Sequence, residues 1–180
     1  LPLMPFDCLE MDIKFIYIKG QHKNALLITV LDTFSRVALE WDLQYSIKHD
    51  AVIYLLKNVI RNWLQIYKPY FDETPVSIRS DNDSRFIAND LKKFLILNDI
   101  SQQFIMPATP QQNAHIESFH SVVEQLVCSK LEFENIEDAR LNIEKFMDTY
   151  NNRRTISSIA YLPPMVFLKE CLENNISLIY

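Results

Sequence analysis

The sequence predicts a single α/β domain in which helices flank a five-stranded mixed sheet. Three observations lead to this fold class. The first quarter of the chain carries three consecutive strand patterns with short connections, and the remainder alternates between strand and helix patterns. At 180 residues, the chain also has the length of one domain, which is most often about 100–200 residues. A meander followed by strand–helix alternation implies a mixed sheet with helices on its faces.

The three strands of the meander come first. Residues 12–19 alternate polar and apolar side chains with period two, which is typical of a half-buried strand. A turn at 20–22 leads into residues 24–32, a nearly all-apolar run that suits an inner strand. Residues 36–43 alternate again, so we expect an antiparallel meander over these three segments.

The second part of the chain alternates between helices and strands. Apolar residues recur at spacings of three and four over residues 47–67, which predicts a long amphipathic helix that Pro69 ends. A strand, a helix, a strand, a proline-punctuated loop, two helices and a short last helix follow. Their expected ranges are, in that order, 75–79, 88–98, 101–106, 107–110, 112–131, 136–151 and 164–172.

The composition excludes several classes of protein. The hydrophobic fraction of 48% and the charged fraction of 23% are close to the averages for globular proteins, which excludes a disordered chain. No run approaches the roughly 18 apolar residues of a membrane span, and the N-terminus lacks the pattern of a signal peptide. The net charge of −5 argues against a generic nucleic-acid coat, but it allows an enzyme that holds cations in an acidic pocket.

Cysteine and glycine usage narrows the choice further. Cys8, Cys128 and Cys171 form no CxxC pair and are odd in number, which excludes a disulfide scaffold or a cysteine zinc site and indicates a reducing, cytoplasmic compartment. Gly20 is the single glycine, so a glycine-rich phosphate loop is excluded. Because the chain does not begin with Met, we expect it to be an excised part of a longer polypeptide.

Three carboxylates stand out by their positions. Asp12 opens the first expected strand, and Asp81 lies just past the end of the fourth, where open α/β sheets place their sites. Glu117 lies early in the helix after the proline loop, about 100° from the apolar stripe at 3.6 residues per turn. Its polar neighbours on that flank are Asn113, His120, Ser121 and Glu124. With 23 acidic residues in the chain, spacing alone does not define a site.

Four blocks around these carboxylates supply the context. In chain order they read LLITVLDTFSRVALEW, SDNDSRF, PQQNAHIESF and YNNRRTISSIAYLPPMVF. Together they resemble the catalytic core of the DDE transposases and retroviral integrases, and in particular the integrase-type transposases of bacterial insertion sequences. The resemblance covers nearly the whole chain and implies a ribonuclease-H-like fold. It also implies transposase chemistry: cutting of element DNA ends and joining of their 3′-hydroxyls to target DNA.

The resemblance assigns Asp12, Asp81 and Glu117 as the catalytic, metal-binding triad. Phosphodiester transfer needs an activated nucleophile and a stabilised leaving oxygen, and two Mg²⁺ or Mn²⁺ ions about 3.5–4 Å apart provide both. Mg²⁺ prefers oxygen ligands and keeps several waters, so a few carboxylates suffice. We expect DNA contacts from five further residues. They are Lys14, Arg85, Asn113, Arg153 and Arg154.

Several positions depart from the family pattern, and two of them bear most on catalysis and DNA binding. Asp83 stands where relatives commonly have Gly, and Glu124 stands where they usually have Lys or Arg near the scissile phosphate. A glutamate there is expected to repel the DNA backbone. These departures keep an alternative open, namely a decayed or domesticated core that serves as a DNA-binding or dimerisation module without catalysis. A third hypothesis is a ribonuclease-H-like nuclease that only hydrolyses DNA or RNA. The PQQNAHIESF block and the C-terminal block argue against it.

The expected partners follow from the same resemblance. They are the element ends, the target DNA and at least one further copy of the chain, in a bacterial cytoplasm and without a membrane. We expect recognition of the end sequence to reside outside these residues, because no helix-turn-helix or zinc-binding segment is evident.

Overall fold

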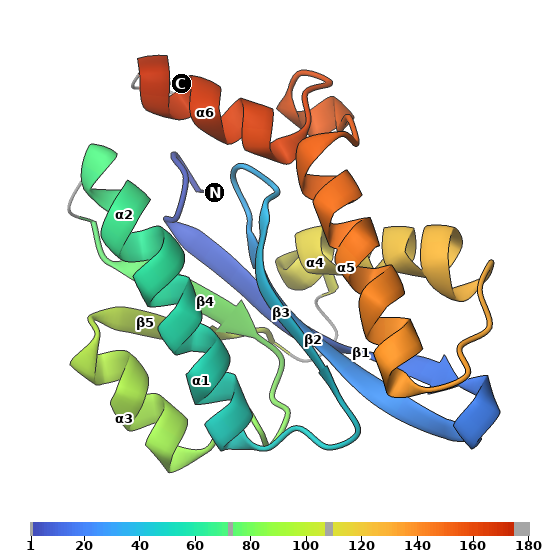
Figure 1. Cartoon of the computed structure of the whole chain (residues 1–180). Coiled ribbons are helices and arrows are strands. Elements are labelled where there is room, and N and C mark those ends of the chain that lie inside the picture. Colours follow the sequence, from blue (N-terminus) through green and yellow to red (C-terminus); the bar gives the residue numbers. More distant parts are fainter. Residues whose placement is uncertain (1, 72–73, 107–109, 175–180) are drawn as a thin grey trace.

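The computed structural model of the chain describes residues 2–71, 74–106 and 110–174 (Figure 1). The strands are β1 (Cys8–Ile18), β2 (Lys23–Asp32), β3 (Ala38–Gln44), β4 (Val76–Ser80) and β5 (Ile100–Phe104). The α-helices are α1 (His49–Val59), α2 (Gln65–Tyr67), α3 (Asn89–Leu97), α4 (Ala114–Val123), α5 (Ile136–Asn152) and α6 (Pro164–Asn174). Wider π turns form η2 (Ile60–Leu64) and η5 (Glu124–Cys128). Short 3-10 turns form η1 (Lys19–Gln21), η3 (Lys68–Tyr70), η4 (Pro110–Asn113) and η6 (Ser157–Ile159).

The five strands form one mixed sheet in the order β3-β2-β1-β4-β5. Strands β1, β2 and β3 are antiparallel neighbours, whereas β1 pairs in parallel with β4 and β4 with β5. The predicted fold class is therefore confirmed. Strand β1 lies at the centre, where the antiparallel half of the sheet meets the parallel half, and the crossover from β3 to β4 brings α1 onto the sheet. Within the described residues, no helix combines the length and apolar character needed to cross a membrane.

The sheet separates two hydrophobic cores. Side chains of β1 alternate between them: Leu9 and Met11 pack with α1 and α3, and Ile16 and Ile18 pack with α4 and α5. Figure 1 shows α1 and α3 on one face of the sheet and α4 and α5 on the other, with α6 across one end. The even-numbered residues of β1 therefore face α4, which fixes the environment of Asp12.

Several expected boundaries are wrong. Strand β1 begins at Cys8, so Asp12 lies inside the strand and does not open it. Leu9, Glu10 and Met11 already carry the apolar–polar alternation, and pairing with β2 and β4 extends the strand back to Cys8. The helix expected over 47–67 passes from α1 through η2 into α2, and Pro69 lies at the start of η3, where no amide hydrogen is needed. Of the proline loop, residues 107–109 lie outside the described residues.

Gly20 is required by close packing. Its amide donates to the carbonyl of Phe133 at 3.0 Å, and a Cβ at this position would lie closer than 3.0 Å to backbone atoms of Glu134. Gly20→Ala is expected to lower the free energy of unfolding by about 1–3 kcal/mol, because backbone must move to admit the methyl group. Urea unfolding measures this change. The exposed neighbour substitution Gln21→Ala serves as control, and equal values for the two variants would contradict the packing argument.

Candidate active site

Asp12, inside β1, lies close to Asp81, which directly follows the end of β4. The parallel pairing of β1 and β4 runs through Glu10 and Arg79, and continuing it by two residues sets Asp12 opposite Asp81. The electrostatics agree with this placement. The pKa of Asp81 is raised by burial and also by the negative charge of Asp12. The structure therefore brings together the two aspartates that the sequence singled out.

Helix α4 and its continuation η5 run alongside β1. Three contacts join them: Glu10 with the amide of Ile116, Asp12 with His120, and Lys14 with Glu124. Each step of two residues along the strand, about 6.6 Å, matches a step of four along the helix, about 6 Å. Because the two spacings agree, these contacts keep the helix parallel to the strand that carries Asp12.

Glu10 anchors the beginning of α4. Its side chain is 1% exposed, and Oε2 accepts a hydrogen bond of 2.8 Å from the amide of Ile116 in the first turn. Arg79 Nη1 lies 3.7 Å from Oε1, and burial raises the pKa of the Glu10 carboxyl. A carboxylate at a helix N-terminus satisfies free amides and interacts favourably with the helix dipole. Sequence reasoning missed Glu10 because the strand was expected to start only at Asp12.

Glu10→Ala is expected to release this anchor. The buried amide of Ile116 loses its acceptor, which should cost about 1–3 kcal/mol of unfolding free energy. Glu10→Gln keeps an acceptor oxygen at the same place and should lose less. Hydrogen exchange at the Ile116 amide reports the contact directly, and it should accelerate in the alanine variant more than in the glutamine variant. Equal exchange in both variants would show that Glu10 does not hold the helix.

Glu117 lies in the first turn of α4, one turn before His120, and its side chain is exposed. Within the described residues, no hydrogen bond joins its side chain to either aspartate. Across the described ranges, no group of three or more His, Cys, Asp or Glu side chains is close enough to hold a metal ion. The pairing of Asp12 with Asp81 is present in the structure, and the participation of Glu117 stays a prediction.

His120 lies beside Asp12. Its ring is 8% exposed, Nδ1 lies 3.4 Å from Oδ2 of Asp12, and Nε2 has no hydrogen-bond partner in the described structure. The sequence placed His120 only among the polar neighbours of Glu117 and did not reveal its burial. The flank of α4 that carries His120 is covered by β1, and only the tertiary structure reveals this.

The acidic departure at Asp83 is paired with a nearby arginine. Arg85 Nε and Nη2 donate to the two oxygens of the Asp83 carboxylate at 2.6 and 2.5 Å. These hydrogen bonds from Arg85 lower the pKa of Asp83. The amide of Asp83 in turn donates to Asp81 Oδ1 at 3.0 Å, so the turn supports Asp81. The charge of Asp83 is therefore balanced by Arg85, and this ion pair leaves Arg85 only partly available to DNA.

The second departure, Glu124, is also neutralised. Its Oε2 lies 2.7 Å from Nζ of Lys14, although the Glu124 side chain is 53% exposed. An exposed pair of this kind contributes about 1 kcal/mol or less to stability. The expected repulsion between Glu124 and a DNA backbone must therefore be counted together with the positive charge of Lys14.

A charge swap tests this pair. Glu124→Lys alone sets two ammonium groups together, and it should tighten DNA binding while lowering stability slightly. The double variant Lys14→Glu/Glu124→Lys restores the pair, so its stability should return to that of the unchanged chain. For DNA, Glu124→Lys should steepen the salt dependence of log K by about 0.9 per added phosphate contact. An unchanged slope would show that this flank of the helix does not face DNA.

The other expected DNA contacts lie in different surroundings. Asn113 occupies the N-cap position of α4 without a side-chain capping hydrogen bond; it is 3% exposed, and its Oδ1 has no partner in the described structure. Arg153 and Arg154 are exposed just after α5. Their side chains form no ion pair within the described ranges.

The comparisons with known proteins agree with this geometry. A family model described as "Integrase core domain" matches residues 2–110, more than half of the chain. A second model of the same description matches residues 98–164. Between them, the two matches include Asp12, Asp81 and Glu117.

Curated relatives come from bacterial insertion elements. An uncharacterized 39.2 kDa protein of insertion element IS476 from Xanthomonas euvesicatoria is 27% identical over 164 residues, covering 91% of this chain and 44% of the relative. The transposase for insertion sequence element IS904 from Lactococcus lactis subsp. lactis is 23% identical over 154 residues, covering 85% of this chain and 58% of the relative. The chain thus spans about half the length of the curated relatives it matches.

Solved structures show the same fold. The HTLV-2 integrase catalytic core domain in complex with magnesium matches with a TM-score of 0.67 and 16% identity, covering 93% of this chain and 99% of that chain. The catalytic core domain of BIV integrase matches with a TM-score of 0.62 and 15% identity, covering 94% and 98%. The five-stranded mixed sheet with flanking helices is therefore the ribonuclease-H-like fold of retroviral integrase cores.

Proposed function

Because this chain belongs to the integrase core domain family, we propose that it is a transposase catalytic core that cuts element DNA ends and joins their 3′-hydroxyls to target DNA. The observation that carries the proposal is the adjacency of Asp12 in β1 and Asp81 at the end of β4, beside the helix that bears Glu117. We propose the whole chain as one catalytic core domain. Its substrates would be the element ends and the target DNA, in a bacterial cytoplasm.

The donor set fits a pair of Mg²⁺ or Mn²⁺ ions. Asp12, Asp81 and Glu117 offer hard carboxylate oxygens, and burial together with Asp12 raises the pKa of Asp81, so a cation would relieve an unfavourable charge. The Asp81 carboxylate accepts a hydrogen bond from the Asp83 amide at Oδ1 and keeps oxygen positions for a ligand. Bound divalent cations would supply the Lewis acid that activates the attacking oxygen and stabilises the leaving one.

The chain's own residues would position this donor set. His120 orients the Asp12 carboxylate through Nδ1, in the way that neighbouring hydrogen bonds fix metal ligands. Glu10 holds the start of α4 and with it the turn that carries Glu117. Rotation of the exposed Glu117 side chain would complete the set when cations bind. No protein nucleophile is required, because the attacking group is water or a DNA 3′-hydroxyl.

Phosphodiester transfer on branched DNA tests the proposal. Strand transfer exchanges one phosphodiester bond for another, so it can be measured in reverse on a duplex that already carries a joined strand, without recognition of element ends. The chain is expected to release the joined strand with Mg²⁺ or Mn²⁺ and not with EDTA. A soluble, folded chain that binds this DNA in the presence of Mn²⁺ but never transfers a strand would overturn the proposal.

That negative outcome would favour the second candidate, a DNA-binding or dimerisation module without catalysis. The acidic departures at Asp83 and Glu124 are the observation on its side. Their pairing with Arg85 and Lys14 weakens this argument, because neither acid presents an unbalanced charge. We propose self-association for both candidates, and sedimentation of the chain over a concentration series measures it.

A further inference from the structure

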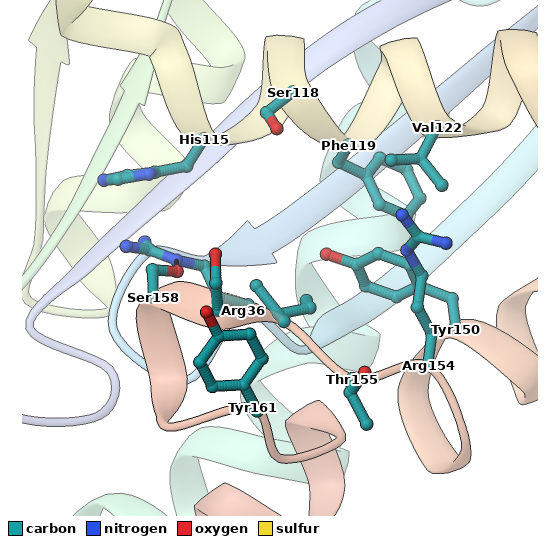
Figure 2. Close-up of a pocket in the computed structure, with 12 residues that line it drawn as sticks. Arg36, His115, Ser118, Phe119, Val122, Tyr150, Arg154, Thr155, Ser158 and Tyr161 are labelled. Carbon is teal, nitrogen blue, oxygen red and sulfur yellow. Dashed lines mark hydrogen bonds between the residues drawn. The ribbon is translucent and has the colours of Figure 1, made fainter.

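A cavity of about 490 Å³ lies on the opposite flank of α4 from His120 and Asp12. Its walls come from α4, the end of α5, the segment 154–161 that follows it, and the turn between β2 and β3 (Figure 2). Three separate parts of the chain, around Arg36, along α4 and over residues 150–161, thus converge on it. The function proposed above assigns no role to this cavity.

Two arginines line the cavity from different sides. Arg36 enters from the β2–β3 turn and Arg154 from the end of α5 (Figure 2). Neither forms an ion pair with a carboxylate in the described part of the chain. No Asp or Glu is among the residues that line the cavity, although the chain has 23 acidic residues and a net charge of −5. The lining of the cavity is therefore positively charged, although Asp32 and Glu10, which lie outside it, act electrostatically on Arg36.

The guanidinium of Arg36 is held in place. Its Nη1 donates to the carbonyl of Thr33, and its Nε lies 3.4 Å from Oγ of Ser158. Because these contacts fix the plane of the guanidinium, less conformational freedom is lost when the remaining N–H groups bind an anion.

Tyr150 supplies a hydroxyl between the two arginines. The residue is 4% exposed, and in Figure 2 its hydroxyl points into the cavity. Burial raises the pKa of Tyr150 to about 12, against the opposing effect of Arg36 and Arg154. The hydroxyl therefore keeps its proton at neutral pH and can donate it in a hydrogen bond. Further hydroxyl donors on the walls are Ser118, Thr155 and Ser158.

We propose that this cavity binds a phosphate group of the DNA backbone, away from the carboxylate site. Two guanidinium groups with surrounding hydroxyls are the donor set that proteins use for phosphate. The inference rests on the proposed function, because it takes DNA as the ligand. Ser118 directly follows Glu117 in α4, so one DNA segment can reach both the cavity and the proposed metal site. Arg153 lines an adjoining hollow with Arg154 and extends the basic surface.

DNA binding measured over a series of salt concentrations, in EDTA, tests the cavity without any catalysis. At about 0.1 M salt, Arg154→Gln is expected to weaken binding about tenfold, the usual effect of losing a charged hydrogen bond. It should also reduce the salt slope by about 0.9, as one phosphate contact disappears. Arg154→Lys keeps the charge and should retain most of the slope. Tyr150→Phe should weaken binding with an unchanged slope.

Arg61→Gln is the matched control, because Arg61 is exposed on η2 and its guanidinium donates only to Asn58 and Asn62 in the described structure. If Arg154→Gln behaves like Arg61→Gln in affinity and slope, the cavity does not bind DNA. A second result would lead to the same conclusion. In that case inorganic phosphate raises the melting temperature only when Arg154 is present, while Arg154→Gln and Arg61→Gln have equal salt slopes of DNA binding. The cavity then binds a free anion and not DNA. Either result leaves the metal-dependent chemistry untouched, so failure of the cavity and failure of the proposed function are distinguishable.

Discussion

Asp81→Asn is expected to abolish both the stabilisation of the chain by Mn²⁺ and its phosphodiester transfer. A ligand that binds only the folded state raises stability by mass action, so the melting temperature of the unchanged chain should climb with Mn²⁺ concentration. The Asn side chain keeps the shape and the acceptor for the Asp83 amide but removes one charge of the aspartate pair. Transfer should fall at least about a hundredfold, because the metals stabilise the transition state by several kcal/mol.

Asp148→Asn is the matched control. Asp148 is exposed on α5, and its carboxylate accepts a hydrogen bond from Asn152, which an asparagine can also accept. Thermal melts with and without Mn²⁺, together with the branched-DNA assay, compare the two variants. The assignment fails if Asp81→Asn and Asp148→Asn respond alike to Mn²⁺.

Phe119→Ala is expected to give the largest loss of stability, about 3–5 kcal/mol of unfolding free energy. Phe119 is 1% exposed and joins α4 to α5. Its ring lies edge-on to Tyr150 with centroids 4.8 Å apart, and 6.0 Å from the ring of Phe146. Removing the ring leaves a cavity between two helices and loosens the helix that carries Glu117. Aromatic contacts of this geometry add to the effect of buried area.

Urea unfolding measures this loss. Leu126→Ala is the control, since Leu126 follows on η5 of the same helical segment but is 41% exposed. The control should lose much less than Phe119→Ala. Comparable losses would show that α4 is not held by its packing on α5. Because Tyr150 contacts Phe119, and both line the cavity that contains Arg154, Phe119→Ala should also weaken DNA binding at that cavity.

The order of strands and helices could be predicted because periodicity changes along the chain. The boundary at Cys8 was missed although Leu9, Glu10 and Met11 continue the alternation, because pairing with β4 decides where this strand begins. The π turns η2 and η5 were also missed, because an apolar stripe continues through them without a change in spacing. Local pattern thus identified the elements, and tertiary pairing decided where they begin and end.

The candidate site was also predictable only in part. The position of Asp81 directly after a strand could be predicted, and the resemblance of four sequence blocks supplied the family. The burial of His120 and the pairing of Lys14 with Glu124 depend on a helix lying parallel to β1, which no local pattern reveals. The cavity around Arg36 and Arg154 draws on segments more than a hundred residues apart in the chain. It could be found only in three dimensions.

A crystal structure of the chain with Mn²⁺, located by its anomalous scattering, tests the central claim most directly. We expect an Mn²⁺ peak between the carboxylates of Asp12 and Asp81, at about 2.0–2.2 Å from their oxygens, the usual range for such small divalent ions. Glu117 should turn toward the same ion or toward a second ion about 3.5–4 Å away. Full occupancy of Mn²⁺ at another group of residues, with Asp12 and Asp81 left unligated, would contradict the account.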